Sequence, residues 1–241
     1  MSKKKERDFY YEFKSDGHQK GVILGIDFTK NPEQRELIRV LNDNRTPIVA
    51  CLGDAGTGKT FTAIAAAIDL VKIQHKYNKI FYIREPLEVG KSLGFLPGTL
   101  DDKFGVYCDG LYDNIEHISQ YSGINPNDLK YNVVCVPPQY IRGRSFENTI
   151  IIVDECQNLS LETIHTISTR LGKYCKLVYL GSMNQIDIRG KTKDNNDFLT
   201  AIKIFESIEQ PIFKKVELIK SERSEYCKII DEAFTKYKNN L

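Results

Sequence analysis

The 241-residue chain has no apolar run near the length of about 18 residues that a membrane-spanning helix needs. Its first residues, Ser2 to Asp8, are charged and are not followed by the apolar core of a secretory signal peptide. The six cysteines form no C-x-x-C pair and mostly lie inside apolar runs, which argues against a disulfide or zinc framework. We therefore expect a cytoplasmic protein with reduced, mostly buried cysteines and no membrane partner.

No excess of one charge is present either, because 34 basic and 32 acidic residues leave a net charge of +2. This balance neither requires nor excludes nucleic acid, since a basic stripe can be hidden in a balanced total. The guanine-reading run Asn-Lys-x-Asp is absent, which argues against a GTPase. A hydrophobic content of 41% and a charged content of 27% are typical of one α/β domain with a full core.

The most informative motif is the run from Gly53 to Thr60, which matches G-x-x-x-x-G-K-[ST]. An apolar stretch at 47–52 precedes it and an Ala-rich stretch follows, as in a strand, loop and helix that bind phosphate; a plain flexible turn is the alternative. The glycines let backbone N–H groups surround a phosphate chain, and the helix start adds its positive dipole end. Lys59 can reach the β- and γ-phosphates, and the Thr60 hydroxyl can ligate Mg²⁺. The predicted ATP-binding residues of this segment are Gly53, Asp54, Ala55, Gly56, Thr57, Gly58, Lys59, Thr60 and Phe61.

Further apolar runs predict strands that alternate with helices. The runs are 80–83, 133–136, 149–153, 176–180 and 212–218, and helical patterns lie at about 160–171, 196–207 and 223–238. Because most of these runs are continuously apolar, they suit strands buried on both faces of a sheet. The sequence therefore predicts a doubly wound, mainly parallel α/β sheet of the P-loop NTPase (RecA-like) type. We expect residues 1–20 to form a partly ordered arm and residues 21–241 an ATPase domain, with an insertion at about 86–130.

Two of the predicted strands end in polar residues that suit phosphoryl chemistry. The strand at 149–153 is followed by Asp154 and Glu155, which can hold Mg²⁺ and activate the attacking water, respectively. Gln185 follows the strand at 176–180 and can contact the γ-phosphate or that water. Solvated turn residues are the alternative in both cases, and for Gln185 the signal is weak.

Other candidate residues depend on context. Gln34 lies on a helix that begins at Asn31-Pro32, and its amide can pair with an adenine edge, although a surface glutamine is the default expectation. Arg142, Arg144 and Arg223 can stabilise transition-state charge or bind nucleic-acid phosphates, although most arginines are only solvated. The four histidines are scattered, and none is given a role.

Taken together, these motifs resemble the PhoH-like family of ATPases, whose nucleotide domain is similar to the first domain of superfamily 1 helicases. The resemblance runs from about Gln34 to Ala233. It is carried by the runs Gly53–Thr60, Arg84–Gly90, Leu93–Leu100, Leu111–Asp113, Tyr140–Ser145, Asp154–Asn158 and Asn184–Asp187. Leu-Gly-Phe-Leu-Pro-Gly and Arg-Gly-Arg within them are more specific to the family than the phosphate loop itself.

The resemblance implies adenine contact at Gln34, phosphate and Mg²⁺ contact at the loop and Asp154, and catalysis by Lys59, Glu155, Gln185 and Arg223. Where the family usually has Gly-Asp, this chain has Gly181-Ser182, and the neighbours of Arg223 also differ from the usual pattern. Relatives carrying an additional nuclease domain are known, but we expect no nuclease activity in this chain.

The function that the sequence predicts is Mg²⁺-dependent ATP hydrolysis coupled to single-stranded RNA or DNA, with RNA favoured. Helicases of this kind place ATP between two domains, so the missing half-site must come from the C-terminus or from a neighbouring subunit. We expect a homo-oligomeric ring, for which the resemblance suggests six subunits, with Arg142, Arg144 or Arg223 reaching the next ATP. The alternatives are a nucleotide-gated scaffold with little hydrolysis and a small-molecule kinase, which is disfavoured because no Arg-rich lid is visible.

Overall fold

The computed structural model describes residues 21–86, 100–182 and 196–239. The predicted arm at 1–20 and the predicted catalytic residue Gln185 lie outside the described residues. Within the described ranges no helix is long and apolar enough to span a bilayer.

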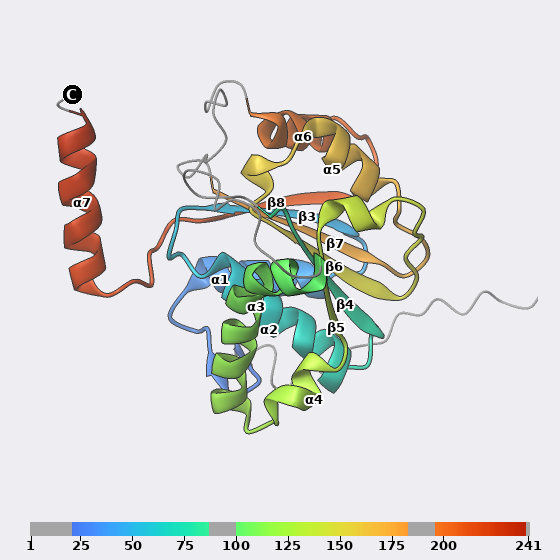
Figure 1. The fold of residues 1–241 in the computed structure, drawn as a ribbon, viewed down its shortest axis with the longest axis horizontal. Helices are drawn as coiled ribbons and strands as arrows, with labels where there is room; N and C mark the ends of the chain where they lie inside the picture. Colours follow the sequence, from blue (N-terminus) through green and yellow to red (C-terminus); the bar gives the residue numbers. More distant parts are fainter. Residues whose placement is uncertain (1–20, 87–99, 183–195, 240–241) are drawn as a thin grey trace, which may run out of the picture.

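Six parallel strands form the central sheet, in the order β5-β4-β6-β7-β3-β8 (Figure 1). The strands are β3 (Ile48–Gly53), β4 (Lys79–Arg84), β5 (Val133–Val136), β6 (Thr149–Asp154), β7 (Lys176–Gly181) and β8 (Phe213–Leu218). Helices cover both faces, so the prediction of a doubly wound parallel sheet is confirmed. A small antiparallel pair, β1 (Val22–Ile23) with β2 (Ile26–Asp27), precedes the sheet.

Burial of the strands follows their position in the sheet. All residues of β6 and β7 are buried, as continuous apolar runs in the middle of a parallel sheet require. In contrast, β8 is an edge strand, and its Lys214, Lys215 and Glu217 are exposed. Charged side chains on an edge strand discourage pairing with another chain.

One helical layer packs on each face of the sheet. The first contains α1 (Pro32–Asn42), α2 (Lys59–Ile68), which continues into a π-helical turn at Asp69–Ile73, and α3 (Leu100–Ser122). The second contains α5 (Leu161–Ser168) and α6 (Asp197–Glu206). The remaining helices are α4 (Pro126–Lys130), two short 3-10 turns at Pro138–Ile141 and Cys156–Asn158, and α7 (Glu225–Asn239). Figure 1 shows α7 standing apart from both layers.

The segment predicted as an insertion connects two neighbouring parallel strands, β4 and β5. Its helix α3 lies in the same layer as α2, and Leu111, Ile115 and Ile118 are buried in the core there. The apolar spacing of these three residues follows the helical period.

The expectation that no cysteines are paired is wrong. A disulfide joins Cys108 of α3 to Cys135 of β5, whose Cα atoms lie 6.4 Å apart although 27 residues separate them in sequence. The sequence carries no spacing signal for this pair, because only the packing of α3 near the edge strand brings the two side chains together. Of the other four, Cys51, Cys156 and Cys175 are free and buried, and Cys227 is free and exposed.

Candidate nucleotide-binding and catalytic site

The predicted phosphate loop lies between β3 and α2, at the carboxyl edge of the sheet. Gly56 and Gly58 adopt φ values of 80° and 81°, which side chains with a Cβ adopt only with strain. Gly58 is the residue before the first turn of α2, whose unpaired backbone N–H groups form an anion-binding end. The loop glycines therefore have the conformation that a phosphate cradle requires.

Lys59 points back into this loop. Its Nζ donates hydrogen bonds to the carbonyl oxygens of Gly53 at 2.6 Å and Asp54 at 2.9 Å. Burial lowers the pKa of Lys59, although Asp154 and Glu155 favour its charged form. The ammonium group is thus held at the mouth of the loop, where a phosphate can replace its carbonyl partners.

The two predicted metal ligands come together although they are 94 residues apart in sequence. The Thr60 hydroxyl donates to the two carboxylate oxygens of Asp154, at 3.2 and 3.3 Å. Asp154 is the last residue of β6 and faces the α2 layer, because side chains alternate along a strand. A backbone N–H from Glu155 also binds this carboxylate, at 3.0 Å.

A hydroxyl and a carboxylate are the hard oxygen ligands that Mg²⁺ prefers at nucleotide sites. The described residues contain no cluster of three or more His, Cys, Asp or Glu side chains with metal-binding geometry. A Mg²⁺ ion at a nucleotide site usually has only one or two protein ligands, and phosphate and water supply the others. Thr60 and Asp154 therefore fit Mg²⁺.

Glu155, the predicted general base, is partly buried directly after β6. Its backbone lies in the left-handed region at φ 55°, a conformation that is enriched at functional sites when the residue is not glycine. Burial and the neighbouring Asp154 raise the pKa of the Glu155 carboxyl.

Gln157 links Glu155 to the end of β7. Its Nε2 donates to Glu155 Oε2 at 2.5 Å, and its Oε1 accepts from the Ser182 N–H at 2.9 Å. Gln157 is fully buried, and its backbone carbonyl accepts from Asn196 Nδ2. It thus links the Glu155 carboxylate to Ser182, directly after β7.

Two residues of β4 complete the acidic end of the site. Tyr82 is fully buried, and its hydroxyl donates to Asp154 Oδ2. Arg84 pairs in register with Asp154. Burial works against the charge on Arg84, but Tyr82, Asp154 and Glu155 raise its pKa.

Gln34 lies against the phosphate loop from the side of α1. Its Nε2 donates to the Thr57 carbonyl oxygen at 3.0 Å, and a Cβ atom at Gly58 would overlap that same nitrogen. The Asn31 side chain caps the helix by accepting from the N–H groups of Glu33 and Gln34. The structure therefore brings Gln34 to the nucleotide side, although the role in adenine contact stays a prediction.

A C-terminal segment, residues 219–224, crosses the phosphate loop; we call it the strap. The Glu222 N–H donates to the Gly56 carbonyl oxygen at 2.8 Å, and Asn31 Nδ2 donates to Glu222 Oε1 at 2.6 Å. A Cβ atom at Gly56 would overlap the Cγ, Cδ and Nε atoms of Arg223. Arg223 of this chain therefore lies on the phosphate loop of the same chain.

The other predicted residues have different surroundings. Phe61 is partly buried and packs against Phe28 and His117. Arg142 and Arg144 are exposed; Arg142 contacts Glu162 at 3.4 Å, and Arg144 donates to the Tyr140 carbonyl oxygen. Arg144 also lies over the Phe81 ring of β4, with its guanidinium carbon 5.7 Å from the ring centroid.

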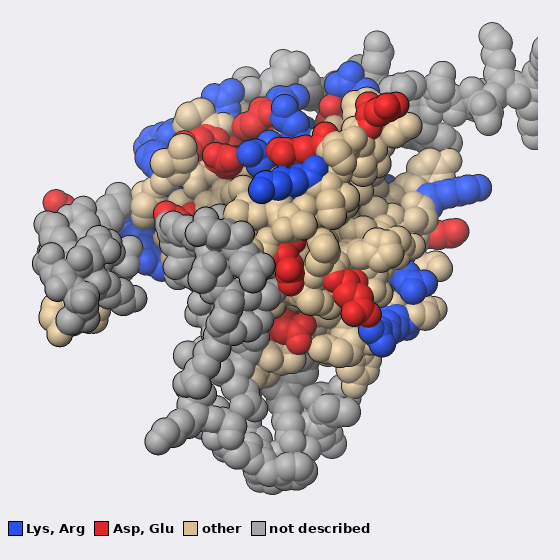
Figure 2. All heavy atoms as spheres, turned by 90° about the horizontal axis from the view of Figure 1, so that it is seen from above, with Lys and Arg blue, Asp and Glu red and all other residues tan. Residues whose placement is uncertain are grey.

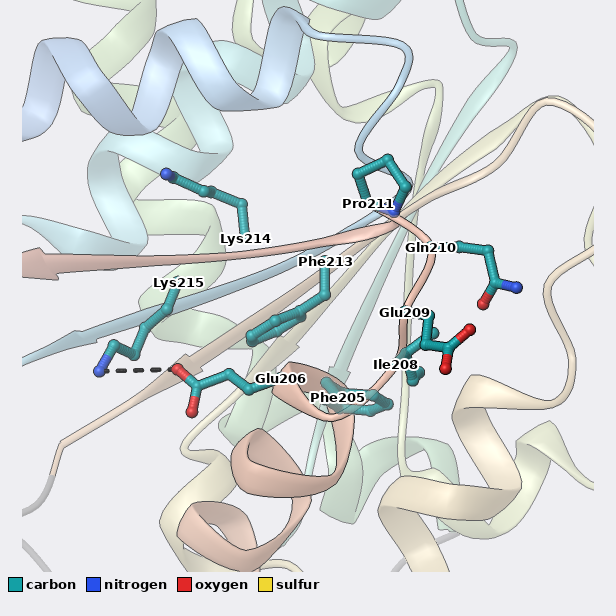
Figure 3. A pocket seen from close by; sticks show the side chains of 9 residues that line it. All are labelled: Phe205, Glu206, Ile208, Glu209, Gln210, Pro211, Phe213, Lys214 and Lys215. Atoms are coloured by element: carbon teal, nitrogen blue, oxygen red, sulfur yellow. Dashed lines mark ion pairs between the residues drawn. The ribbon is translucent and has the colours of Figure 1, made fainter.

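A hollow of about 340 Å³ lies at the opposite end of β8 from the phosphate loop (Figure 3). An ion pair at 3.8 Å between Lys215 and Glu206 lies beside it, and Phe205 and Phe213 line its inner side. Its surface is open and mixed in character, and it contains none of the predicted site residues.

Charge on the face that carries α5 and α6 is mixed. Figure 2 shows Lys and Arg interspersed with Asp and Glu over the described part of this face, with no field of one sign. This agrees with the balanced total of the sequence.

The sequence analysis did not predict five residues that contact the candidate site. They are Asn31, Tyr82, Arg84, Gln157 and Glu222. Gln157 follows Glu155 by two residues inside the run Asp154–Asn158, and its place in that motif was a usable signal. Tyr82 had no such signal, because a tyrosine within an apolar run reads as core.

Comparison with known proteins assigns the chain to one family. The family model described as PhoH-like protein matches residues 28–235. Protein PhoH2 of Bacillus subtilis (strain 168) is 33% identical over 201 residues, which cover 81% of this chain and 45% of that protein. A PhoH-like protein of the same strain is 32% identical over 191 residues, which cover 78% of this chain and 58% of that protein. The chain thus spans about half the length of these curated relatives.

Solved structures show weaker similarity. The Pif1 helicase from Candida albicans is 17% identical with a TM-score of 0.40, and the match covers 83% of this chain and 42% of that one. The SWI2/SNF2 ATPase core of Sulfolobus solfataricus, in complex with dsDNA, is 16% identical with a TM-score of 0.39. That match covers 77% of this chain and 44% of the other chain. Similarities of this size add nothing to what the strand order establishes about the fold.

Proposed function

Because the chain belongs to the PhoH-like family, we propose that it binds ATP with Mg²⁺ and hydrolyses it. The observation that carries the proposal is the convergence of Thr60, Asp154 and Glu155 at the start of α2. A glutamate with a left-handed backbone and a raised pKa beside a phosphate-binding loop is typical of a catalytic site.

The residues divide the work as follows. The loop N–H groups and Lys59 bind the β- and γ-phosphates, and Thr60 with Asp154 holds the cation. Bound Mg²⁺ would neutralise charge that develops on the phosphate oxygens. Glu155 accepts a proton from the attacking water, and Gln157 keeps the Glu155 carboxylate oriented.

We also propose that Arg223 completes the site from within the same chain. Its side-chain stem lies on Gly56, within the loop that we expect to bind the phosphates, so its guanidinium group is available to the γ-phosphate. An arginine in this role stabilises the transition state of phosphoryl transfer. Gln185 stays a predicted partner of the water or the γ-phosphate.

Coupling to single-stranded RNA, or to DNA, is the second element of the proposal. It is supported by the resemblance to superfamily 1 helicases and by the exposed guanidinium groups of Arg142 and Arg144, which suit phosphate contacts. The proposal also includes a homo-oligomer, which we expect to be a ring of six subunits.

Phosphate release measured with and without single-stranded RNA and DNA, at several salt concentrations, tests the enzymatic part. We expect Mg²⁺-dependent release that Lys59→Ala abolishes, and stimulation by RNA that weakens as salt rises. Tight ATP binding without turnover would favour the alternative, a nucleotide-gated scaffold. Phosphate transfer to a metabolite would instead indicate a kinase.

A further inference from the structure

The helix α7 (Glu225–Asn239) directly follows the strap, which crosses the phosphate loop. The strap is anchored to α1, because Glu33 Oε2 accepts from the N–H groups of Ile219 at 2.6 Å and Lys220 at 3.0 Å. Beyond Arg223 the chain turns outward, and α7 stands away from the body (Figure 1). Within the described part of the chain, α7 has no extensive packing against any other helix or strand.

One side of α7 is apolar and exposed. Its large apolar side chains are 58–79% exposed and are Tyr226, Ile229, Ile230, Phe234 and Tyr237. At about 100° per residue, these positions fall within an arc of about 140°. A helix with such a stripe normally buries it against a partner, and a 15-residue helix is marginal in water without one.

The exposed area indicates what kind of partner suits this face. From typical side-chain areas, the five residues present about 500 Å² of apolar surface. A stable specific interface buries about 800 Å² on each partner, so one such face is too small alone. If two copies each supply α7 and each receive the other's helix, the buried area per copy roughly doubles and passes that value.

We infer that α7 is an exchange arm whose apolar face, formed by Tyr226, Ile229, Ile230, Phe234 and Tyr237, packs against a second copy of this chain. This rests on the proposed homo-oligomer and names one of its contacts, which joins two copies as an exchanging pair. The short strap keeps the docked helix close to the phosphate loop, so the contact between copies forms beside the nucleotide site.

The exposed Cys227 makes the inference measurable in the whole protein. It is the exposed member of the four free cysteines, so an environment-sensitive fluorophore can be attached to it under native conditions. We expect its emission to shift to shorter wavelength as protein concentration rises. Light scattering of the unlabelled chain at the same concentrations should show a mass above that of the 27.6 kDa monomer.

The variant Ile230→Glu combined with Phe234→Glu should abolish both the emission shift and the larger mass. Because α7 lacks packing against the body, the thermal midpoint of the body should stay unchanged in this variant, which separates lost docking from misfolding. The control is Tyr174→Ser, which removes an aromatic side chain that is 71% exposed on the body and should leave the mass unaltered.

Three outcomes with the protein alone overturn the inference: a monomer at all concentrations, an oligomer that survives the double substitution, or a label buried independently of concentration, which means that α7 folds onto its own body. Burial of the label only when RNA is added overturns it as well. ATP hydrolysis is measured separately in the wild-type chain, so a wild-type oligomer without hydrolysis would contradict the proposed function and leave this inference intact.

Discussion

The Tyr82 hydroxyl donates a hydrogen bond to Oδ2 of Asp154 from inside the sheet. Tyr82 pairs in register with Ile152 on the neighbouring strand, and Asp154 follows Ile152 by two residues on the same face. The tyrosine is fully buried, and burial together with Asp154 raises its pKa well above the ordinary range. It therefore stays protonated and acts as a permanent donor to the candidate Mg²⁺ ligand.

Tyr82→Phe should raise the Mg²⁺ concentration needed for half-maximal ATP hydrolysis, because outer hydrogen bonds orient a metal ligand. Loss of such a partner typically weakens metal binding about 10-fold to 100-fold. Mg²⁺-dependent binding of a fluorescent ATP analogue should weaken in parallel, and binding without Mg²⁺ should not change.

Tyr179→Phe is the matched control, since Tyr179 is also fully buried and hydrogen-bonds through its hydroxyl to Ser168 and to the Ile164 carbonyl. That change should cost about 1 kcal/mol of stability and leave the Mg²⁺ requirement alone. Equal effects of both variants on the Mg²⁺ requirement would show that Tyr82 only stabilises the fold.

Glu155→Gln should leave ATP binding near the wild-type level and reduce hydrolysis by about 10²-fold to 10⁴-fold, because the amide does not accept a proton from water. Binding is measured by equilibrium titration and turnover by phosphate release. Glu162→Gln, on the exposed start of α5, is an isosteric control that should behave as the wild type. Strongly reduced ATP binding in Glu155→Gln would assign Glu155 to the binding site instead.

The sequence was sufficient for the sheet and for bringing Thr60 and Asp154 together, although the roles of these residues stay predictions. Continuous apolar runs in β6 and β7 indicated strands that are buried on both faces. The phosphate-loop motif and Asp154 at the end of a strand indicated that Thr60 and Asp154 lie close together. Both signals are local, and the fold rule for parallel strands then places their carboxyl ends at one edge.

Long-range packing was beyond local signals. The disulfide between Cys108 and Cys135 depends on how α3 lies near an edge strand. The strap depends on hydrogen bonds to residues far away in sequence, such as the bond from the Glu222 N–H to Gly56. Neither residue type nor spacing encodes such contacts. The same holds for Tyr82, which looks like core in sequence and acts as a hydrogen-bond donor in the fold.

The stability of the chain should rise between about pH 7 and about pH 8.5, because of two buried lysines. Burial lowers the pKa of Lys176 to about 7 and that of Lys76 to about 8. In this window the unfolded chain keeps these protons and the folded chain loses them, so the unfolding free energy increases with pH. One proton of difference gives about 1.4 kcal/mol per pH unit.

Urea titrations at several pH values measure this slope, and Lys176→Met should make it shallower. Above about pH 8.5 the rise should become shallower, since buried thiols such as Cys51 keep their protons in the folded state while the unfolded chain loses them. Lys130→Met, at a more exposed lysine paired with Glu116, serves as the control and should keep the wild-type slope. A flat profile in the wild type would mean that Lys176 stays charged through its bonds to the Val40, Asp43 and Thr46 carbonyls.

Arg223 should act on the ATP of its own chain, since its side chain lies on the Gly56 of that chain. Arg223→Ala should lower hydrolysis by about 10³-fold or more with little loss of ATP binding, as expected for a group that stabilises transition-state charge.

Mixing this variant with Lys59→Ala then shows whether Arg223 acts on the ATP of its own chain or on that of a neighbour. If the arginine acts within one chain, every ATP site in a mixed assembly lacks either Lys59 or Arg223, so the mixture stays inactive. If it acts on the neighbour, subunits with an intact Lys59 beside an intact Arg223 appear, and activity recovers in proportion to their number. Recovery would therefore assign Arg223 to the adjacent subunit, whereas inactivity at every mixing ratio supports the contact seen on Gly56.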